Sequence, residues 1–259
     1  MHMHLSFSSI KDFNFCPFYY KLTRIDKLRP FKGNIFTAFG TAVHSASEQI
    51  LIKKDQKYNP LPYFKKELDK EISLLEDEVD EKQKSEFYIS GVRIIENVLD
   101  FMKEKFGDYE VIATEKNIRV PVPFEEDLHN DFDFVGFVDC IIKTKDGRHH
   151  IIDWKTCSWG WDARRKSDTM TTYQLSYYKF FYSMMTGTDL DNIDTHFVLM
   201  KRVTKGYPIE LVEVANGKKK TNNALKLLET AAYNVDNENF VKNKLSCSKC
   251  DFHRTINCP

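Results

Sequence analysis

A carboxylate and a lysine stand two residues apart, at Asp153 and Lys155, inside the largely apolar segment 150–156. The segment is typical of a short buried strand, on which side chains two residues apart point to the same face. A metal-binding anion and a cation would therefore share one site. Such a pair suits phosphodiester cleavage, because a cation can stabilise the negative charge that builds up on the phosphate. Since Asp-x-Lys triplets also arise by chance, the rest of the chain must supply the other parts.

A second carboxylate, Asp139, lies in the preceding apolar segment 132–144. Residues 145–147 predict a tight turn between the two segments, so the strands are expected to pair antiparallel and to put Asp139 close to opposite Asp153. Two ionised carboxylates at that separation repel each other, and a divalent cation removes the repulsion. Oxygen ligands favour Mg²⁺ or Mn²⁺ over zinc. Two simpler interpretations are that Asp139 ends a strand in solvent, and that Asp153 and Lys155 form an ion pair on the surface. The apolar residues that flank both sites disfavour these interpretations.

Three more polar side chains could join this site. His44 lies in a predicted helix over 36–53, where a lone histidine is more often a hydrogen-bonded core residue. It becomes a candidate metal ligand if that helix packs over the strand ends. Gln174 and Tyr178 are four residues apart on a helix predicted over 168–185, so they share one face. The amide could bind a phosphate or a base edge, and the ring could stack on a base.

The elements that must position these residues are predicted from apolar spacing and from β-branched and aromatic content. Helices are expected over 6–26, 36–53, 62–106 with a polar break near 80–85, 168–185 and 219–233. Strands are expected over 109–120, 132–144, 148–155, 196–202 and 209–214. This order predicts an α/β fold in one domain, with a mainly helical part (1–107), an α/β core (108–235) and a cysteine-rich tail (236–259) that folds against the Cys16 region.

Composition narrows the class of protein. Hydrophobic residues make up 42% of the chain and charged residues 29%, and the formal net charge is zero. No apolar run approaches the roughly 18 residues of a membrane helix, and no apolar signal region follows the first residues. We therefore expect a cytoplasmic protein without membrane contact. The basic clusters at 164–166, 201–202 and 218–220 are, taken singly, more often solvated surface. The chain lacks the Gly-x-x-x-x-Gly-Lys-Ser/Thr loop that a helicase motor would need.

Four of the six cysteines are placed like metal ligands, at Cys16, Cys247, Cys250 and Cys258. A Cys-x-x-Cys with a third cysteine nearby favours a metal or cluster site, and disulfides are rare in the cytosol. Zinc could be held by all four, or by three of them with His253. Cys140 and Cys157 lie in or beside apolar segments and are expected to be inert small hydrophobic residues.

In this order, the motifs resemble the RecB-like branch of the PD-(D/E)XK nuclease superfamily. They are Gly40…His44, Gly136…Asp139, Asp153…Lys155 and Gln174…Tyr178. The resemblance covers nearly the whole chain, from Ser6 to Cys258, and implies a restriction-endonuclease-like core with a central mixed sheet flanked by helices.

The resemblance also implies roles for these residues. The metal ligands would be His44, Asp139, Asp153 and the backbone carbonyl of Trp154, and Lys155 would be catalytic. Gln174 and Tyr178 would contact DNA near the cleaved bond. Glu115, on the first predicted strand, could orient a neighbour without a direct role.

The cysteine pattern resembles that of the AddB-type and CRISPR-associated nucleases, in which one N-terminal and three C-terminal cysteines hold an iron–sulfur cluster. Four thiolates are what a [4Fe–4S] cluster needs. The stretch between Cys250 and Cys258 is longer than the family usually has. By this resemblance the cysteines would clamp the ends of the domain together.

We expect from all of this a Mg²⁺- or Mn²⁺-dependent DNA nuclease. By family analogy it would be an exonuclease on single strands or DNA ends, acting in recombination, repair or phage DNA metabolism. It could have protein partners in a recombination, repair or CRISPR-like complex. One alternative is an inactive nucleic-acid-binding or assembly module of the same fold. Another is a zinc-stabilised structural protein.

Overall fold

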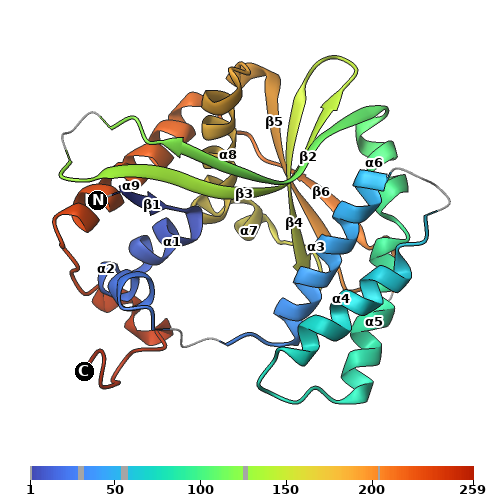
Figure 1. The fold of residues 1–259 in the computed structure, drawn as a ribbon, viewed down its shortest axis with the longest axis horizontal. Coiled ribbons are helices and arrows are strands. Elements are labelled where there is room, and N and C mark those ends of the chain that lie inside the picture. Colours follow the sequence, from blue (N-terminus) through green and yellow to red (C-terminus); the bar gives the residue numbers. More distant parts are fainter. Residues whose placement is uncertain (1, 29–31, 54–57, 125–127, 204) are drawn as a thin grey trace.

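The computed structural model describes residues 2–28, 32–53, 58–124, 128–203 and 205–259. Within them one mixed sheet forms the centre of the molecule (Figure 1). Its strands are β1 (His2–Leu5), β2 (Tyr109–Pro121), β3 (Asp131–Thr144), β4 (His149–Cys157), β5 (Ile193–Lys201) and β6 (Ile209–Glu213). They lie in the order β1-β3-β4-β5-β6, and β2 pairs with the other edge of β3. The pairs β1·β3 and β4·β5 are parallel, and the other three pairs are antiparallel.

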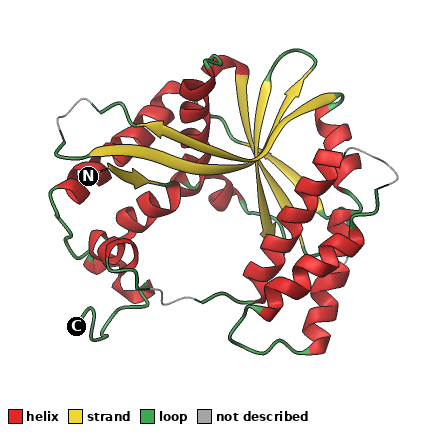
Figure 2. Ribbon diagram, in the orientation of Figure 1, coloured by secondary structure: helices red, strands yellow, loops and turns green. Residues whose placement is uncertain are grey.

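Helices cover both faces of this sheet (Figures 1 and 2). One face carries α1 (Phe7–Phe15), α8 (Thr169–Thr186) and α9 (Lys218–Asp236). The other carries α3 (Ile35–Lys53), α4 (Leu61–Ser73), α5 (Glu81–Ile95) and α6 (Val98–Phe106). Shorter elements complete the chain: α2 (Pro17–Tyr20), a π-helical turn (Lys21–Ile25), α7 (Ala163–Ser167) and 3-10 turns at Leu190–Asn192 and Lys244–Lys249. This arrangement confirms the predicted α/β fold class.

The sheet separates two hydrophobic cores, and β4 contributes to both. Ile151 faces the core under α8 and α9, whereas Ile152 and Trp154 face the core under α3 to α6. All three are fully buried. A strand covered on both faces is usually a continuous apolar run, so the oppositely charged pair Asp153 and Lys155 stands out in β4.

The helix predicted over 6–26 is broken at Cys16, whose extended backbone (φ −164°, ψ 119°) separates α1 from α2. Cys16 precedes Pro17, and the proline ring disfavours helical geometry in the residue before it. Two elements were not predicted at all, namely β1 and α7. β1 has only four residues and joins the sheet through its backbone, so side-chain pattern gave little signal. The part predicted as mainly helical therefore supplies a strand to the central sheet.

The helix predicted over 62–106 with one break near 80–85 is three helices, with breaks at 74–80 and 96–97. The remaining predicted elements are present within a few residues of their expected ends. No helix in the described ranges combines the length and apolar character of a membrane-spanning segment.

A buried histidine pair lies near the N-terminal ends of β4 and β5. His150 Nδ1 and His196 Nε2 are 3.1 Å apart, and the edge of Phe106 contacts both rings. His196 is 6% exposed, and its Nδ1 has no hydrogen-bond partner among the described residues. Burial, and then the neighbouring His150, lower the pKa of His196 to about 4. The fold therefore holds this ring neutral.

The pair predicts an acid-dependent loss of stability. Because the pKa of His196 is lower in the folded than in the unfolded chain, the unfolded state binds the proton first as pH falls. Stability from this group is complete above about pH 6.5 and declines towards pH 4. Between pH 7 and 5, wild type should lose about 2 kcal/mol more unfolding free energy than His196→Gln. Urea unfolding at both pH values measures the difference, and equal losses in the two proteins would contradict it.

Candidate active site

The site lies where the edge of β3 is left open. On this edge β1 pairs with residues 131–134 and β4 with residues 140–143, so residues 135–139 lie between the two partners. The last backbone pair towards the gap joins Cys140 and Ile152, and continuing the register by one residue brings Asp139 opposite Asp153. There the carboxylate replaces the backbone ladder, because Trp154 N–H donates to Asp139 Oδ2 at 2.7 Å.

Asp153 is 2% exposed and is held from two sides. Gln174 Nε2 donates to its Oδ1 at 2.7 Å, and Lys155 Nζ lies 2.5 Å from its Oδ2. Lys155 and Asp153 therefore form an ion pair at this oxygen. Burial raises the pKa of Asp153 to about 6, although the charge of Lys155 opposes the rise. Lys155 remains about a third exposed, so its ammonium reaches solvent.

The helix α8 supplies Gln174 and Tyr178 to this site. Gln174 Nε2 also lies 3.2 Å from Tyr178 Oη, so the two side chains form one hydrogen-bonded row beside Asp153. Burial, and then the charge of Asp153, raise the pKa of Tyr178, which keeps its hydroxyl protonated. Gly136 makes this packing possible, because a Cβ there would lie 2.7 Å from Tyr178 Cε1. This contact gives a physical reason for the glycine three residues before Asp139.

Gly136→Ala is therefore expected to disturb the site, although residue 136 itself is not one of the proposed metal ligands or catalytic residues. The new methyl group must displace the Tyr178 ring, and with it the Gln174 hydrogen bonds that hold Asp153. Overpacking of this kind costs about 1–3 kcal/mol of unfolding free energy. Chemical denaturation measures that cost. The control is Gly217→Ala, because a Cβ at Gly217 meets no neighbouring atom. Gly107→Ala is unsuitable, because Gly107 has a positive φ. An unchanged stability in Gly136→Ala would refute the tight contact.

His44 reaches the site from α3. Its Nδ1 lies 3.8 Å from Asp139 Oδ2, and burial lowers its pKa to about 4, so the ring is neutral at pH 7. Gly40 allows the approach of the helix, because a Cβ there would be 3.2 Å from Thr156 Oγ1 on β4. A neutral imidazole is the form that can bind a metal ion.

Two glutamates lie next to the site: Glu115, which the sequence suggested as a residue that orients a neighbour, and Glu48, which was not predicted. Glu48 lies one helical turn after His44, and burial, together with Glu115 and Asp139, raises its pKa to about 8. Glu115 lies on β2 between residues that pair with Cys140 and Val138, and its φ is +46°. Such backbone strain in a residue other than glycine is concentrated at functional sites. The spacing of four from His44 was the signal that could have identified Glu48.

The donor chemistry of this group fits a hard divalent cation in part. Asp139 and Asp153 offer carboxylate oxygens, which are the ligands that Mg²⁺ and Mn²⁺ prefer. Yet no cluster of three or more His, Cys, Asp and Glu side chains in the described residues is arranged to hold a metal ion. Lys155 Nζ occupies the position next to Asp153 Oδ2.

The cysteines come together elsewhere, where the two ends of the chain meet. Cys16, Cys247, Cys250, Cys258 and His253 line one pocket, and none of the cysteines is in a disulfide. Burial raises the pKa of Cys250, and Cys16 and Cys258 add to the rise.

The contact between these chain ends has its own hydrogen bonds. Asn243 N–H donates to Cys16 Sγ at 3.2 Å, and the side chains of Asn243 and Ser246 donate to the carbonyl of Phe15 at 2.9 and 2.5 Å. These bonds join segments more than 220 residues apart in the chain.

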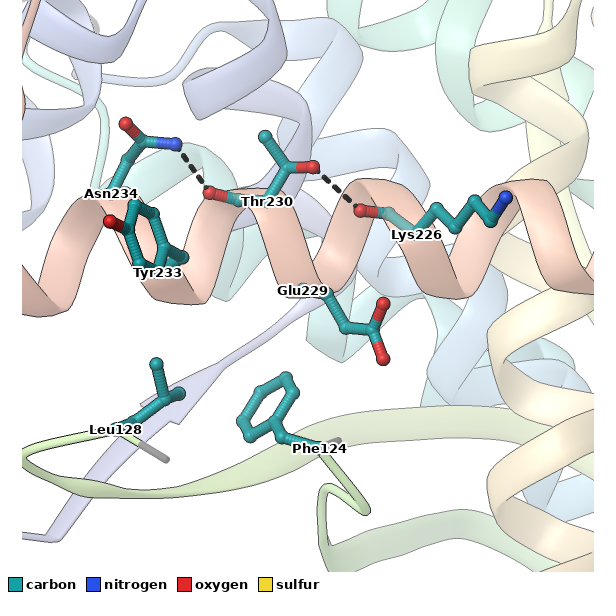
Figure 3. Close-up of a pocket in the computed structure, with 7 residues that line it drawn as sticks. All are labelled: Phe124, Leu128, Lys226, Glu229, Thr230, Tyr233 and Asn234. Carbon is teal, nitrogen blue, oxygen red and sulfur yellow. Dashed lines mark hydrogen bonds between the residues drawn. The ribbon is translucent and has the colours of Figure 1, made fainter. Parts of the chain in front are cut away.

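A further pocket lies between α9 and the residues that follow β2 (Figure 3). Its described lining residues are Phe124, Leu128, Lys226, Glu229, Thr230, Tyr233 and Asn234. Thr230 and Asn234 donate to carbonyls of their own helix. The pocket therefore contains none of the side chains considered above, and two of its polar groups are already bonded.

Comparison with known proteins identifies the class to which this fold and site belong. Residues 4–255 match the PD-(D/E)XK nuclease superfamily, so the chain belongs to that superfamily. No curated protein sequence matches it. The chain is similar over 99% of its length to a crystal structure from Eubacterium rectale titled "Putative exonuclease", with 16% identity, a TM-score of 0.62 and 90% of that chain covered. At that identity the likeness concerns the fold.

A crystal structure of SSO0001 is similar over 82% of this chain and 92% of its own, with 14% identity and a TM-score of 0.38.

Proposed function

We propose that this protein is a divalent-metal-dependent nuclease that hydrolyses phosphodiester bonds in DNA. The observation that carries the proposal is the buried Asp153, which contacts both Lys155 and Gln174 and lies opposite Asp139 at a break in the sheet. A buried carboxylate is costly unless it is paired with a cation or binds a ligand, and Lys155 is one such partner of Asp153. Membership of a nuclease superfamily supports the same reaction, since its members generally use divalent metals.

The residues have distinct roles in this proposal. Asp139, Asp153, His44 and the backbone carbonyl of Trp154 would hold Mg²⁺ or Mn²⁺. When bound, such an ion polarises the phosphate and lowers the pKa of a water molecule. Lys155 would leave Asp153 Oδ2 and place its ammonium against the phosphate oxygens, where negative charge grows during the reaction.

The neighbouring side chains would keep these groups in place. Gln174 fixes the orientation of the Asp153 carboxylate through its 2.7 Å hydrogen bond, and Tyr178 fixes Gln174. Gln174 and Tyr178 would also face the DNA next to the cleaved bond. Glu48 and Glu115 are close to Asp139 and share a hydrogen bond. We propose that they position His44 and Asp139.

We further propose that the enzyme is an exonuclease on single strands or DNA ends, in recombination, repair or phage DNA metabolism. The support is the motif resemblance and the description of the Eubacterium rectale protein. The test uses end-labelled linear single strands, linear duplex, closed circular single strands and RNA, each with Mn²⁺. We expect linear single-stranded DNA to be degraded and the circles to persist. Equal cleavage of circles would contradict an exonuclease. If no substrate is cleaved, the chain is a binding module and the proposal is wrong.

We also propose a [4Fe–4S] cluster at Cys16, Cys247, Cys250 and Cys258, with zinc as the alternative. The support is their common pocket. Anaerobically purified protein should be brown and contain iron and sulfide, and Cys250→Ser should lose both. A colourless protein with one zinc per chain would refute the cluster.

A further inference from the structure

The segment that follows the catalytic strand exposes a large aromatic ring. β4 ends at Cys157, and residues 158–162 connect it to α7. Trp159, four residues after Lys155, is 78% exposed. Tryptophan is highly buried on average, because it carries more apolar surface than most side chains. A tryptophan ring left in water at this place in the fold is available to stack on a ligand.

The backbone around Trp159 is held in position. Arg202 N–H donates to the carbonyl of Cys157 at 2.9 Å, and Arg202 Nη2 donates to Ser158 Oγ at 2.6 Å. The Arg202 guanidinium lies 4.6 Å from the ring centroids of both Phe36 and Phe87. On the other side, Gly160 passes so close to β6 that a Cβ would lie 2.9 Å from Glu210 Oε2. The exposed ring is thus presented by an anchored connection.

The same connection is packed against the proposed catalytic lysine. Trp161 is 6% exposed and its ring lies 5.1 Å from that of Phe197. Lys155 Nζ lies 5.6 Å from the centroid of the same Phe197 ring. One aromatic ring therefore contacts both Lys155 and Trp161, the residue that anchors the connection.

Cations follow the exposed ring on α7. The Arg165 guanidinium lies 4.7 Å from the Trp161 ring, which orients it, and Arg165 is exposed. Arg164 is exposed too and makes no ion pair with any residue that the structure describes. Lys166, by contrast, is paired with Glu210. An exposed ring next to two available guanidinium groups matches the chemistry of a nucleic-acid strand, whose bases stack and whose phosphates pair with cations.

We propose that Trp159 stacks on an unpaired base beside the scissile phosphate and that Arg164 and Arg165 bind the adjoining backbone phosphates. This inference rests on the proposed nuclease function and adds to it the residues that bind the strand next to the cleaved bond. Bases within a duplex are already stacked on their neighbours, so only a single strand or a frayed end offers a free face to Trp159. Every base has such a face, so the contact selects single strands without selecting sequence.

The test measures binding with the metal chelated by EDTA, so that cleavage does not interfere. Anisotropy of a short labelled single-stranded oligonucleotide should show binding about 5- to 150-fold weaker for Trp159→Ala. Trp159→Phe keeps a stacking ring and should lie between that variant and wild type. Tyr233→Ala removes an exposed ring in the pocket of Figure 3 and should bind like wild type. Equal affinity of Trp159→Ala and wild type would overturn the inference.

Abasic oligonucleotides locate the contact. Removing one base at a time should weaken wild-type binding most at a single position, and Trp159→Ala should lose that position dependence. A position dependence that persists in Trp159→Ala would contradict stacking on this ring. Failure of this inference can be distinguished from failure of the proposed function. If wild type cleaves DNA and Trp159→Ala binds normally, the inference alone is wrong, and if wild type binds single strands without cleaving any substrate, the proposed function is wrong.

Discussion

Lys155→Ala is expected to slow DNA cleavage by about 10²- to 10³-fold, the usual loss when one preorganised group that stabilises the transition state is removed. Lys155 is the cation nearest the proposed metal ligands, 2.5 Å from Asp153 Oδ2. Its side chain is partly exposed, so truncation should leave the fold intact. Single-turnover rates at saturating Mn²⁺ measure the effect on the chemical step. Lys155→Arg should recover only part of the rate, because a planar guanidinium cannot replace a compact ammonium in this position.

The matched control for this variant is Lys70→Ala. Lys70 also forms a carboxylate pair, 3.0 Å from Glu67, but on α4 in the helical layer. The Lys70→Ala variant should cleave DNA at the wild-type rate. If Lys155→Ala and Lys70→Ala are equally active, Lys155 has no catalytic role, and any activity that survives every substitution in the site points to a contaminant.

Asp153→Asn is expected to change activity and stability in opposite directions. Without metal, burial holds the pKa of Asp153 at about 6, above its value in the unfolded chain. Such a group contributes stability below its unfolded pKa and loses that contribution as pH rises through 6. At pH 7 the ionised carboxylate therefore costs the metal-free fold about 1–3 kcal/mol, which the neutral amide avoids. Denaturant unfolding in EDTA should show Asp153→Asn to be more stable than wild type.

Metal should reverse that ranking. A ligand that binds only the folded state adds stability, about 2.7 kcal/mol at a hundred times its dissociation constant. Mn²⁺ should therefore raise the melting temperature of wild type but not of Asp153→Asn. An equal rise in both proteins would show that the ion binds elsewhere, and a wild type more stable than Asp153→Asn in EDTA would contradict the cost of the buried charge.

Several features of the site followed from local sequence. The turn at residues 145–147 determines the register of β3 and β4, and register alone brings Asp139 opposite Asp153. Apolar neighbours on both sides of Asp153 indicated its burial. Gln174 and Tyr178 share a face of α8 because they are one helical turn apart, as their hydrogen bond shows.

Other features depend on tertiary contacts that no local pattern encodes. The opening in the sheet at residues 135–139 exists because β1, from the far N-terminus, pairs with the start of β3. The hydrogen bond between Glu48 and Glu115 arises from the packing of α3 over β2. The joining of the chain ends depends on Asn243 and Ser246, whose hydrogen bonds to Phe15 span most of the sequence. The exposure of Trp159 also depends on tertiary structure, because no local pattern distinguishes it from a buried aromatic residue.

The most direct test of the central claim is the rate at which wild type and Asp153→Asn release labelled nucleotide from linear single-stranded DNA in Mn²⁺. Both proteins should be folded, with Asp153→Asn at least as stable in EDTA. We predict steady release by wild type, none when EDTA replaces Mn²⁺, and a loss of about 10²-fold or more in Asp153→Asn. Release by Asp153→Asn at the wild-type rate would contradict the assignment of Asp153 and Lys155 as the centre of the site.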